Sequence, residues 1–190
     1  ALCALAVLLV GLARPHADLS VPRREATVML VLDTSRSMAA TDVSPSRFAA
    51  ALRAADAFLE AVPSSYSVGI VSFSTSAQVV LRPTTDRDQA RAALHELRLG
   101  SGTAIGEAIA RAVATVRPGA ATGAPSSATA VPATVLLLSD GAQTSDGLTP
   151  AAAATQARRL GIPVNTVALG TRDAVVEVPL PGGLEQQVTV

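Results

Sequence analysis

Residues 26–37 read ATVMLVLDTSRS, an apolar run that ends in an acidic, hydroxyl-rich segment. The part over 26–33 is continuously apolar and contains β-branched residues, which predicts a strand buried on both faces. The polar residues after it predict a loop at the carboxyl end of that strand. Strands covered on both faces are typical of parallel sheets, so this stretch favours an α/β fold.

Apolar strands alternate with amphipathic helices along the rest of the chain. Further strands are predicted over 67–74, 77–81, 134–140 and 164–169. The strand over 77–81 is expected to pair with the strand over 67–74 as a short hairpin. Helices are predicted from Ser44-Pro45 to Pro63 and over 86–97, 103–116 and 150–160. In the first helix we expect Ser44 to be the N-cap and Pro45 the first helical residue. The alternation predicts a doubly wound, mostly parallel, Rossmann-like sheet with helices on both faces and one short antiparallel edge strand.

The two ends of the chain have a different character. Ala1 to Leu12 is uncharged and apolar, but it is shorter than the roughly 20 residues that cross a bilayer. We expect the end of a transmembrane helix here, with a signal-peptide core or a buried helix as alternatives. Residues 1–24 are thus interpreted as this segment plus a linker, and residues 25–190 as one domain. The last twenty residues hold two β-prone pieces around Pro181-Gly182-Gly183, which predicts a hairpin.

Charge and cysteine content exclude several function classes. Fifteen basic and fifteen acidic residues cancel, so no basic excess would drive binding to a phosphate backbone, and we expect no nucleic-acid partner. The single cysteine cannot form an internal disulfide, and no Cys/His cluster suits structural zinc.

Polar side chains follow two of the predicted strands. Asp33, Ser35 and Ser37 come after the first, Asp140 ends the strand at 134–140, and Thr103 lies on a glycine-rich turn. Because open parallel sheets bind ligands at the carboxyl ends of their strands, we expect these five residues to converge. Hydroxyl and carboxylate oxygens suit a hard cation, which favours Mg²⁺, with Mn²⁺ or Ca²⁺ as alternatives.

The donor set also indicates what such a site would do. The hydroxyl ligands are neutral, so the bound metal would stay electrophilic and attract a carboxylate from outside. We therefore expect the site to bind a protein partner that presents an acidic side chain. The pattern offers no obvious nucleophile, so we expect no enzyme activity and no catalytic residue.

The motif Asp33-x-Ser35-x-Ser37, followed by Thr103 and Asp140, resembles the metal-ion-dependent adhesion site of von Willebrand factor A domains. The resemblance covers roughly residues 26–170. It implies the von Willebrand factor A fold and a metal site made of these five residues.

Within that superfamily, residues 28–51 (VMLVLDTSRSMAATDVSPSRFAAA) are similar to a bacterial membrane-anchored group, the Bat-type aerotolerance and actinobacterial proteins. The resemblance implies a membrane anchor just before the domain and a domain outside the cytoplasm. It also implies MoxR-type AAA+ ATPases or other membrane proteins with this domain as partners. Two departures stand out: Arg36 replaces a common glycine, and the chain stops at Val190, where another helix-and-strand unit would be expected.

Other interpretations of the same residues remain open. Asp33, Ser35 and Ser37 could be loop formers on a metal-free scaffold. A haloacid-dehalogenase-like phosphotransferase would use Asp33 as its nucleophile, but it needs an acid at position 35 and a lysine, and the chain has no lysine. Asp42 is interpreted as a helix-entry residue and Asp146 as a turn residue, so neither is a predicted ligand.

Overall fold

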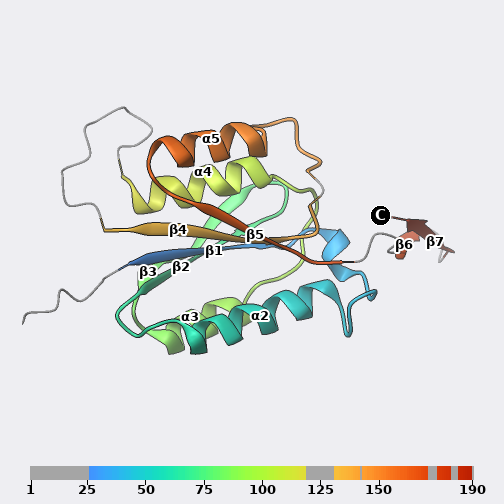
Figure 1. Ribbon diagram of the computed structural model, residues 1–190. Helices are drawn as coiled ribbons and strands as arrows, with labels where there is room; N and C mark the ends of the chain where they lie inside the picture. Colours follow the sequence, from blue (N-terminus) through green and yellow to red (C-terminus); the bar gives the residue numbers. More distant parts are fainter. Residues whose placement is uncertain (1–25, 119–130, 142, 171–174, 181–183, 190) are drawn as a thin grey trace, which may run out of the picture.

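The computed structural model describes residues 26–118, 131–141, 143–170, 175–180 and 184–189. Their centre is a five-stranded sheet with the order β3-β2-β1-β4-β5 (Figure 1). The strands are β1 (Thr27–Asp33), β2 (Ser67–Phe73), β3 (Ala77–Thr84), β4 (Ala133–Ser139) and β5 (Val164–Ala168). Only β3 runs antiparallel to its neighbour; the other pairings are parallel. The predicted mostly parallel sheet with one antiparallel edge strand is confirmed.

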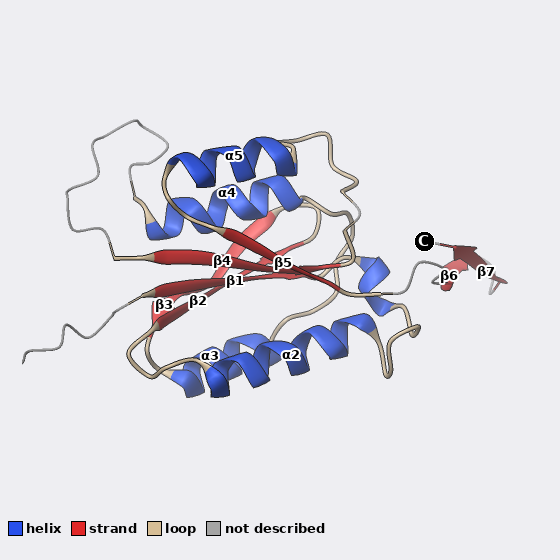
Figure 2. Ribbon diagram, viewed as in Figure 1, coloured by secondary structure: helices blue, strands red, loops and turns tan. Residues whose placement is uncertain are grey.

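Helices cover both faces of this sheet, as Figure 2 shows. One face carries α2 (Arg47–Ala61) and α3 (Arg87–His95), and the other carries α4 (Ile105–Val116) and α5 (Pro150–Arg159). A short 3-10 turn, η1 (Arg36–Ala39), follows β1. The doubly wound arrangement predicted from the sequence is therefore confirmed.

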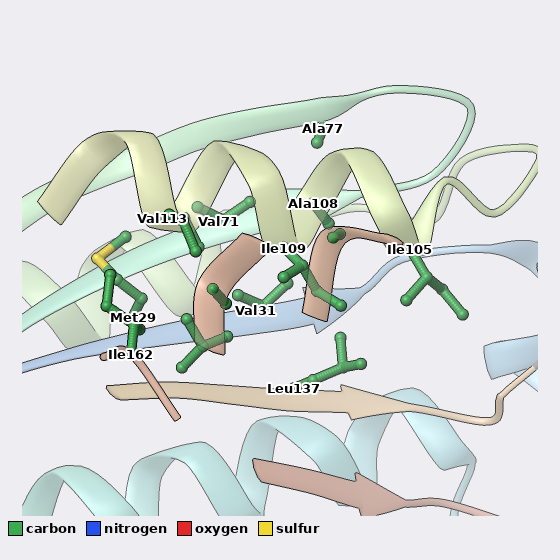
Figure 3. Close-up of a cluster of buried hydrophobic side chains, with 14 of the residues drawn as sticks. Met29, Val31, Val71, Ala77, Ile105, Ala108, Ile109, Val113, Leu137 and Ile162 are labelled. Carbon is green, nitrogen blue, oxygen red and sulfur yellow. The ribbon is translucent and has the colours of Figure 1, made fainter. Parts of the chain in front are cut away.

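The central strand β1 explains the continuous apolar run. It lies between β2 and β4, and its alternate side chains point to opposite faces. Met29 and Val31 pack in the cluster that includes Ile109 of α4 (Figure 3). Leu30 and Leu32 pack in the cluster formed with α2 and α3. Both sides of the strand are buried from Val28 to Leu32, which explains why these residues are all apolar.

The first helix begins later than the sequence suggested. Ser46, and not Ser44, is the N-cap of α2, and its hydroxyl accepts a hydrogen bond from the Ala49 N–H at 3.1 Å. Pro45 follows a cis peptide bond and precedes the helix. The prediction of Ser44 as N-cap was wrong because two serines flank the proline, and local pattern cannot choose between them.

The ends of the chain are described in part. β6 (Val175–Leu180) and β7 (Leu184–Thr189) form an antiparallel pair in a second sheet, which confirms the predicted hairpin. The apolar run at 1–12 and the linker after it lie outside the described residues. Among the residues that are described, no helix is long and apolar enough to cross a membrane.

Candidate metal centre

Four of the five predicted ligands, Asp33, Ser35, Ser37 and Asp140, lie at or just after the ends of β1 and β4. The two strands are parallel neighbours with Leu32 opposite Leu138, so Asp33 lies beside Ser139. A hydrogen bond of 2.6 Å from the Ser139 hydroxyl to Oδ2 of Asp33 joins the two strand ends. Asp140 is the next residue, and the sheet therefore places both predicted carboxylates at one edge.

Asp33 is fully buried and held on both oxygens. Its Oδ1 accepts a hydrogen bond from the Ser35 N–H at 2.8 Å, while its Oδ2 accepts from Ser139. Burial raises the pKa of Asp33; the hydrogen bonds from Ser139 and Ser35 oppose this effect, and the charge of Asp140 adds to it. The carboxylate is thus rigidly placed, but its negative charge is costly without a nearby cation.

The two serines of the motif present their hydroxyls together. Ser35 is buried and precedes η1, in which Ser37 lies. Their Oγ atoms are 3.0 Å apart, a distance at which either can donate to the other. Met38, fully buried in the same turn, anchors the segment to the core. The structure therefore brings the two predicted hydroxyl ligands side by side.

Thr103 is buried on the loop before α4. Its N–H donates to the Thr144 hydroxyl at 3.0 Å, and its carbonyl accepts from the Thr144 N–H at 3.2 Å. Nearby, the Gly100 N–H donates to the Thr34 carbonyl at 2.6 Å, which ties the loop to the segment after β1. Among the hydrogen bonds of the described residues, none joins Thr103 to the other four predicted ligands.

Asp140 has one satisfied and one open oxygen. Its Oδ2 accepts from Nη1 of Arg47 at 3.0 Å. Its Oδ1 is buried and has no hydrogen-bond partner. A buried carboxylate oxygen in this state is destabilising unless another group, such as a cation, meets it. The donor chemistry at this edge therefore fits a divalent metal.

Arg47 was not foreseen as part of the site. Its Nε and Nη2 donate to the two carboxylate oxygens of Asp42 at 2.8 and 3.2 Å. Burial disfavours the guanidinium charge, but hydrogen bonds and charges of Asp42 and Asp140 outweigh it and raise the pKa of Arg47. Asp42, interpreted as a helix-entry residue, is thus an ion-pair partner as well. Asp146 is exposed.

The site would depend on hydroxyl ligands. In the part of the chain that the structure describes, no group of three or more His, Cys, Asp or Glu side chains is placed to hold a metal ion. A metal centre at this edge would therefore need oxygen ligands besides carboxylates. The hydroxyls of Ser35, Ser37 and Thr103 stay the predicted ones.

Comparison with known proteins identifies the family. The sequence profile described as the von Willebrand factor type A domain matches residues 28–143. The chain belongs to the von Willebrand factor type A domain family. Two relatives named UPF0353 protein are 40% identical over 182 residues in Mycobacterium sp. (strain KMS) and 39% identical over 189 residues in Nocardia farcinica. Each alignment covers 92% of this chain, and 53% and 56% of the respective relatives, so the chain spans about half their length.

This von Willebrand factor type A domain is similar to solved structures of a membrane-protein group. An aerotolerance-related membrane protein from Bacteroides fragilis superposes with a TM-score of 0.71 at 27% identity, covering 86% of this chain and 81% of that one. BatB from Bacteroides thetaiotaomicron gives a TM-score of 0.67 at 26% identity, with 87% and 80% covered. The resemblance to Bat-type proteins is therefore confirmed.

The buried charge of Asp33 predicts a pH effect on the metal-free domain. The pKa of Asp33 lies above its ordinary value of 3.8, so the folded state keeps a proton that the unfolded chain has lost. The free energy of unfolding should therefore fall as pH rises from about 4 through the raised pKa. Urea unfolding with a chelator, compared at each pH between wild type and Asp33→Asn, isolates this contribution. The same pH dependence of the free energy of unfolding in the two proteins would contradict this prediction.

Proposed function

We propose that this von Willebrand factor type A domain is a metal-ion-dependent protein-binding module. Asp33, Ser35, Ser37, Thr103 and Asp140 would hold Mg²⁺, with Mn²⁺ or Ca²⁺ as alternatives. A bound metal would supply an electrophilic coordination position for a carboxylate of the partner. The domain itself would act by binding, without catalysis.

One observation carries this proposal: the buried Oδ1 of Asp140 has no partner. Arg47 holds the other oxygen, so the carboxylate cannot simply turn away to satisfy the open one without losing that hydrogen bond. The hydroxyls of Ser35 and Ser37, 3.0 Å apart, lie on the segment that follows the neighbouring strand β1 and add oxygen ligands without adding charge. Such a donor set favours a hard divalent cation.

The partner would present an acidic side chain. Arg36 is exposed between the two serines of the motif and adds positive charge at the rim of the site. This charge would steer a carboxylate toward the metal and speed association. We extend the proposal to membrane tethering through residues 1–12, with the domain outside the cytoplasm. A MoxR-type AAA+ system or another membrane protein with this domain would supply the partner.

Calorimetric titration of the chain with Mg²⁺, Mn²⁺ and Ca²⁺ tests the proposal. We expect saturable binding by the wild type and a loss of affinity of at least about 100-fold in Asp33→Ala, because replacing even an outer-shell partner costs about 10–100-fold. Asp146→Ala is the matched control, since it removes an equal charge from an exposed position on the loop after β4. It should bind within about twofold of wild type.

The other outcomes separate the alternatives. A wild-type chain that is folded by circular dichroism and binds none of the three metals would leave the metal-free scaffold as the function. Mg²⁺-dependent hydrolysis of a phosphate monoester that is lost in Asp33→Ala would favour the phosphotransferase. Equal loss of affinity in Asp33→Ala and Asp146→Ala would place the metal elsewhere.

A further inference from the structure

Arg47 is a buried cation at the first position of α2. Its side chain is 3% exposed, and its guanidinium contacts one carboxylate five residues earlier, Asp42, and one 93 residues later, Asp140. Three of its nitrogens donate, two to Asp42 and one to Asp140. A buried arginine with this many charge-assisted hydrogen bonds is fixed in position and orientation.

The contact with Asp42 orients the guanidinium of Arg47 toward Asp140. Two parallel hydrogen bonds to Asp42 fix the guanidinium plane, which leaves Nη1 to meet Oδ2 of Asp140 at 3.0 Å. Holding Oδ2 restrains the rotation of the carboxylate. The hydrogen bond therefore limits the directions in which the open Oδ1 of Asp140 can point.

A third segment closes over the guanidinium. Gly170 follows β5, and a Cβ built on it would lie 2.8 Å from both Nε and Cζ of Arg47. Its φ is +125°, a backbone conformation that other residues rarely adopt. The Leu169 N–H also donates to the Ser139 carbonyl at 3.0 Å. Arg47 is thus packed between the loop before α2, the end of β4 and the chain after β5.

We propose that Arg47 is the positioning residue of the metal site and sets its preference for Mg²⁺. This inference rests on the proposed metal-binding function. Arg47 holds Asp140 with one oxygen open and offsets part of the negative charge that Asp33, Asp42 and Asp140 bring together. Mg²⁺ demands near-octahedral ligands, whereas Ca²⁺ tolerates flexible ones, so fixing Asp140 favours Mg²⁺.

Arg47→Lys tests the inference because it keeps the charge and removes the planar fork. A lysine ammonium cannot hold both oxygens of Asp42 and one of Asp140 in the arrangement described, so Asp140 should loosen. We expect Mg²⁺ affinity to fall about 10–100-fold, in the range seen for outer-shell changes at metal sites. The fold-loss in Ca²⁺ affinity should be smaller than the fold-loss in Mg²⁺ affinity, by about fivefold or more, because calcium coordination is flexible. Both are measured by calorimetry.

Arg53→Lys is the matched control on the same helix. Arg53 is exposed and donates to the Ser44 carbonyl at 2.6 Å, so the substitution perturbs the same loop without touching a carboxylate. It should leave both affinities within about twofold of wild type.

Asp42→Asn is the second variant. It weakens the hold on the guanidinium and should shift the ratio of Mg²⁺ to Ca²⁺ affinity in the same direction as Arg47→Lys. It therefore tests the role of Arg47 if Arg47→Lys does not fold.

The outcomes are distinguishable. Affinities for both metals that stay at the wild-type level in folded Arg47→Lys would overturn the role of Arg47 and leave the proposed function standing. An equal fall in both affinities, which leaves their ratio unchanged, would also overturn the Mg²⁺ preference, because a merely structural effect lowers them together. A wild-type chain that binds neither metal would overturn the proposed function and this inference with it.

Discussion

Gly106→Ala should destabilise the domain by about 3 kcal/mol, the upper end of the usual range for overpacking. Gly106 is the second residue of α4, and in a helix interior a change from glycine to alanine normally adds about 1 kcal/mol of helix stability. Here the added Cβ would clash with the Leu148 carbonyl oxygen and would lie 2.6 Å from the Leu148 carbonyl carbon and 2.8 Å from that of Thr149. These are backbone atoms, so no side-chain rotation relieves the clash, and the sign of the effect reverses.

The clash should also reach the metal site. The Gly106 N–H donates to Oε1 of Gln143 at 3.3 Å, and the Gln143 amide donates back to the Leu148 carbonyl at 3.4 Å. The loop after β4 therefore lies directly on the start of α4. Moving Leu148 would shift Thr144, whose two hydrogen bonds position Thr103. We expect weaker Mg²⁺ binding together with the loss of stability.

Urea unfolding in the presence of a chelator measures the stability change, and Gly147→Ala is the control. Gly147 lies in the same loop, and the nearest atom to its built Cβ is the Ser145 hydroxyl oxygen at 4.0 Å. Its substitution should change the free energy of unfolding by less than about 0.5 kcal/mol. A Gly106→Ala variant as stable as Gly147→Ala would mean that the loop does not pack on α4 in this way.

Sequence pattern was sufficient for the sheet and for part of the site. Residues 28–32 had to be apolar because β1 is covered by helices on both faces, and a run of that kind is visible without any structure. The placement of Asp33, Ser35 and Ser37 follows from the strand end and from local spacing. Asp140 could be added because parallel strands end at the same edge.

The contacts that organise the carboxylates could not be predicted. The hydrogen bond from Ser139 to Asp33 spans 106 residues of sequence, and that from Arg47 to Asp140 spans 93. Pairing of this kind depends on strand order and on how α2 packs, neither of which a local pattern contains. Arg47 has the appearance of an ordinary first-turn residue, although a charged residue beside Phe48 and before Ala51 could have been suspected of pointing toward the sheet edge.

Arg47→Met should destabilise the metal-free domain by about 3–5 kcal/mol, the usual cost of removing one member of a buried ion pair. Methionine fills a similar volume, so little of this loss would come from a cavity. The cost would arise because the side chains of Asp42 and Asp140, 10% and 2% exposed, keep their charges without the guanidinium. Chemical denaturation with a chelator measures the change.

Combining Arg47→Met with Asp140→Asn shows whether the uncompensated charge causes the loss of stability. With the Asp140 carboxylate neutralised, the loss of stability on adding Arg47→Met should shrink by about 0.5–3 kcal/mol, the coupling expected for residues in direct contact. Effects that add within about 0.5 kcal/mol would mean that Arg47 stabilises the fold by packing alone. Mg²⁺ gives an independent check in Arg47→Met itself. A cation that binds only the folded state stabilises it by mass action, so excess Mg²⁺ should restore part of the stability if a metal neutralises the carboxylates that Arg47 otherwise holds.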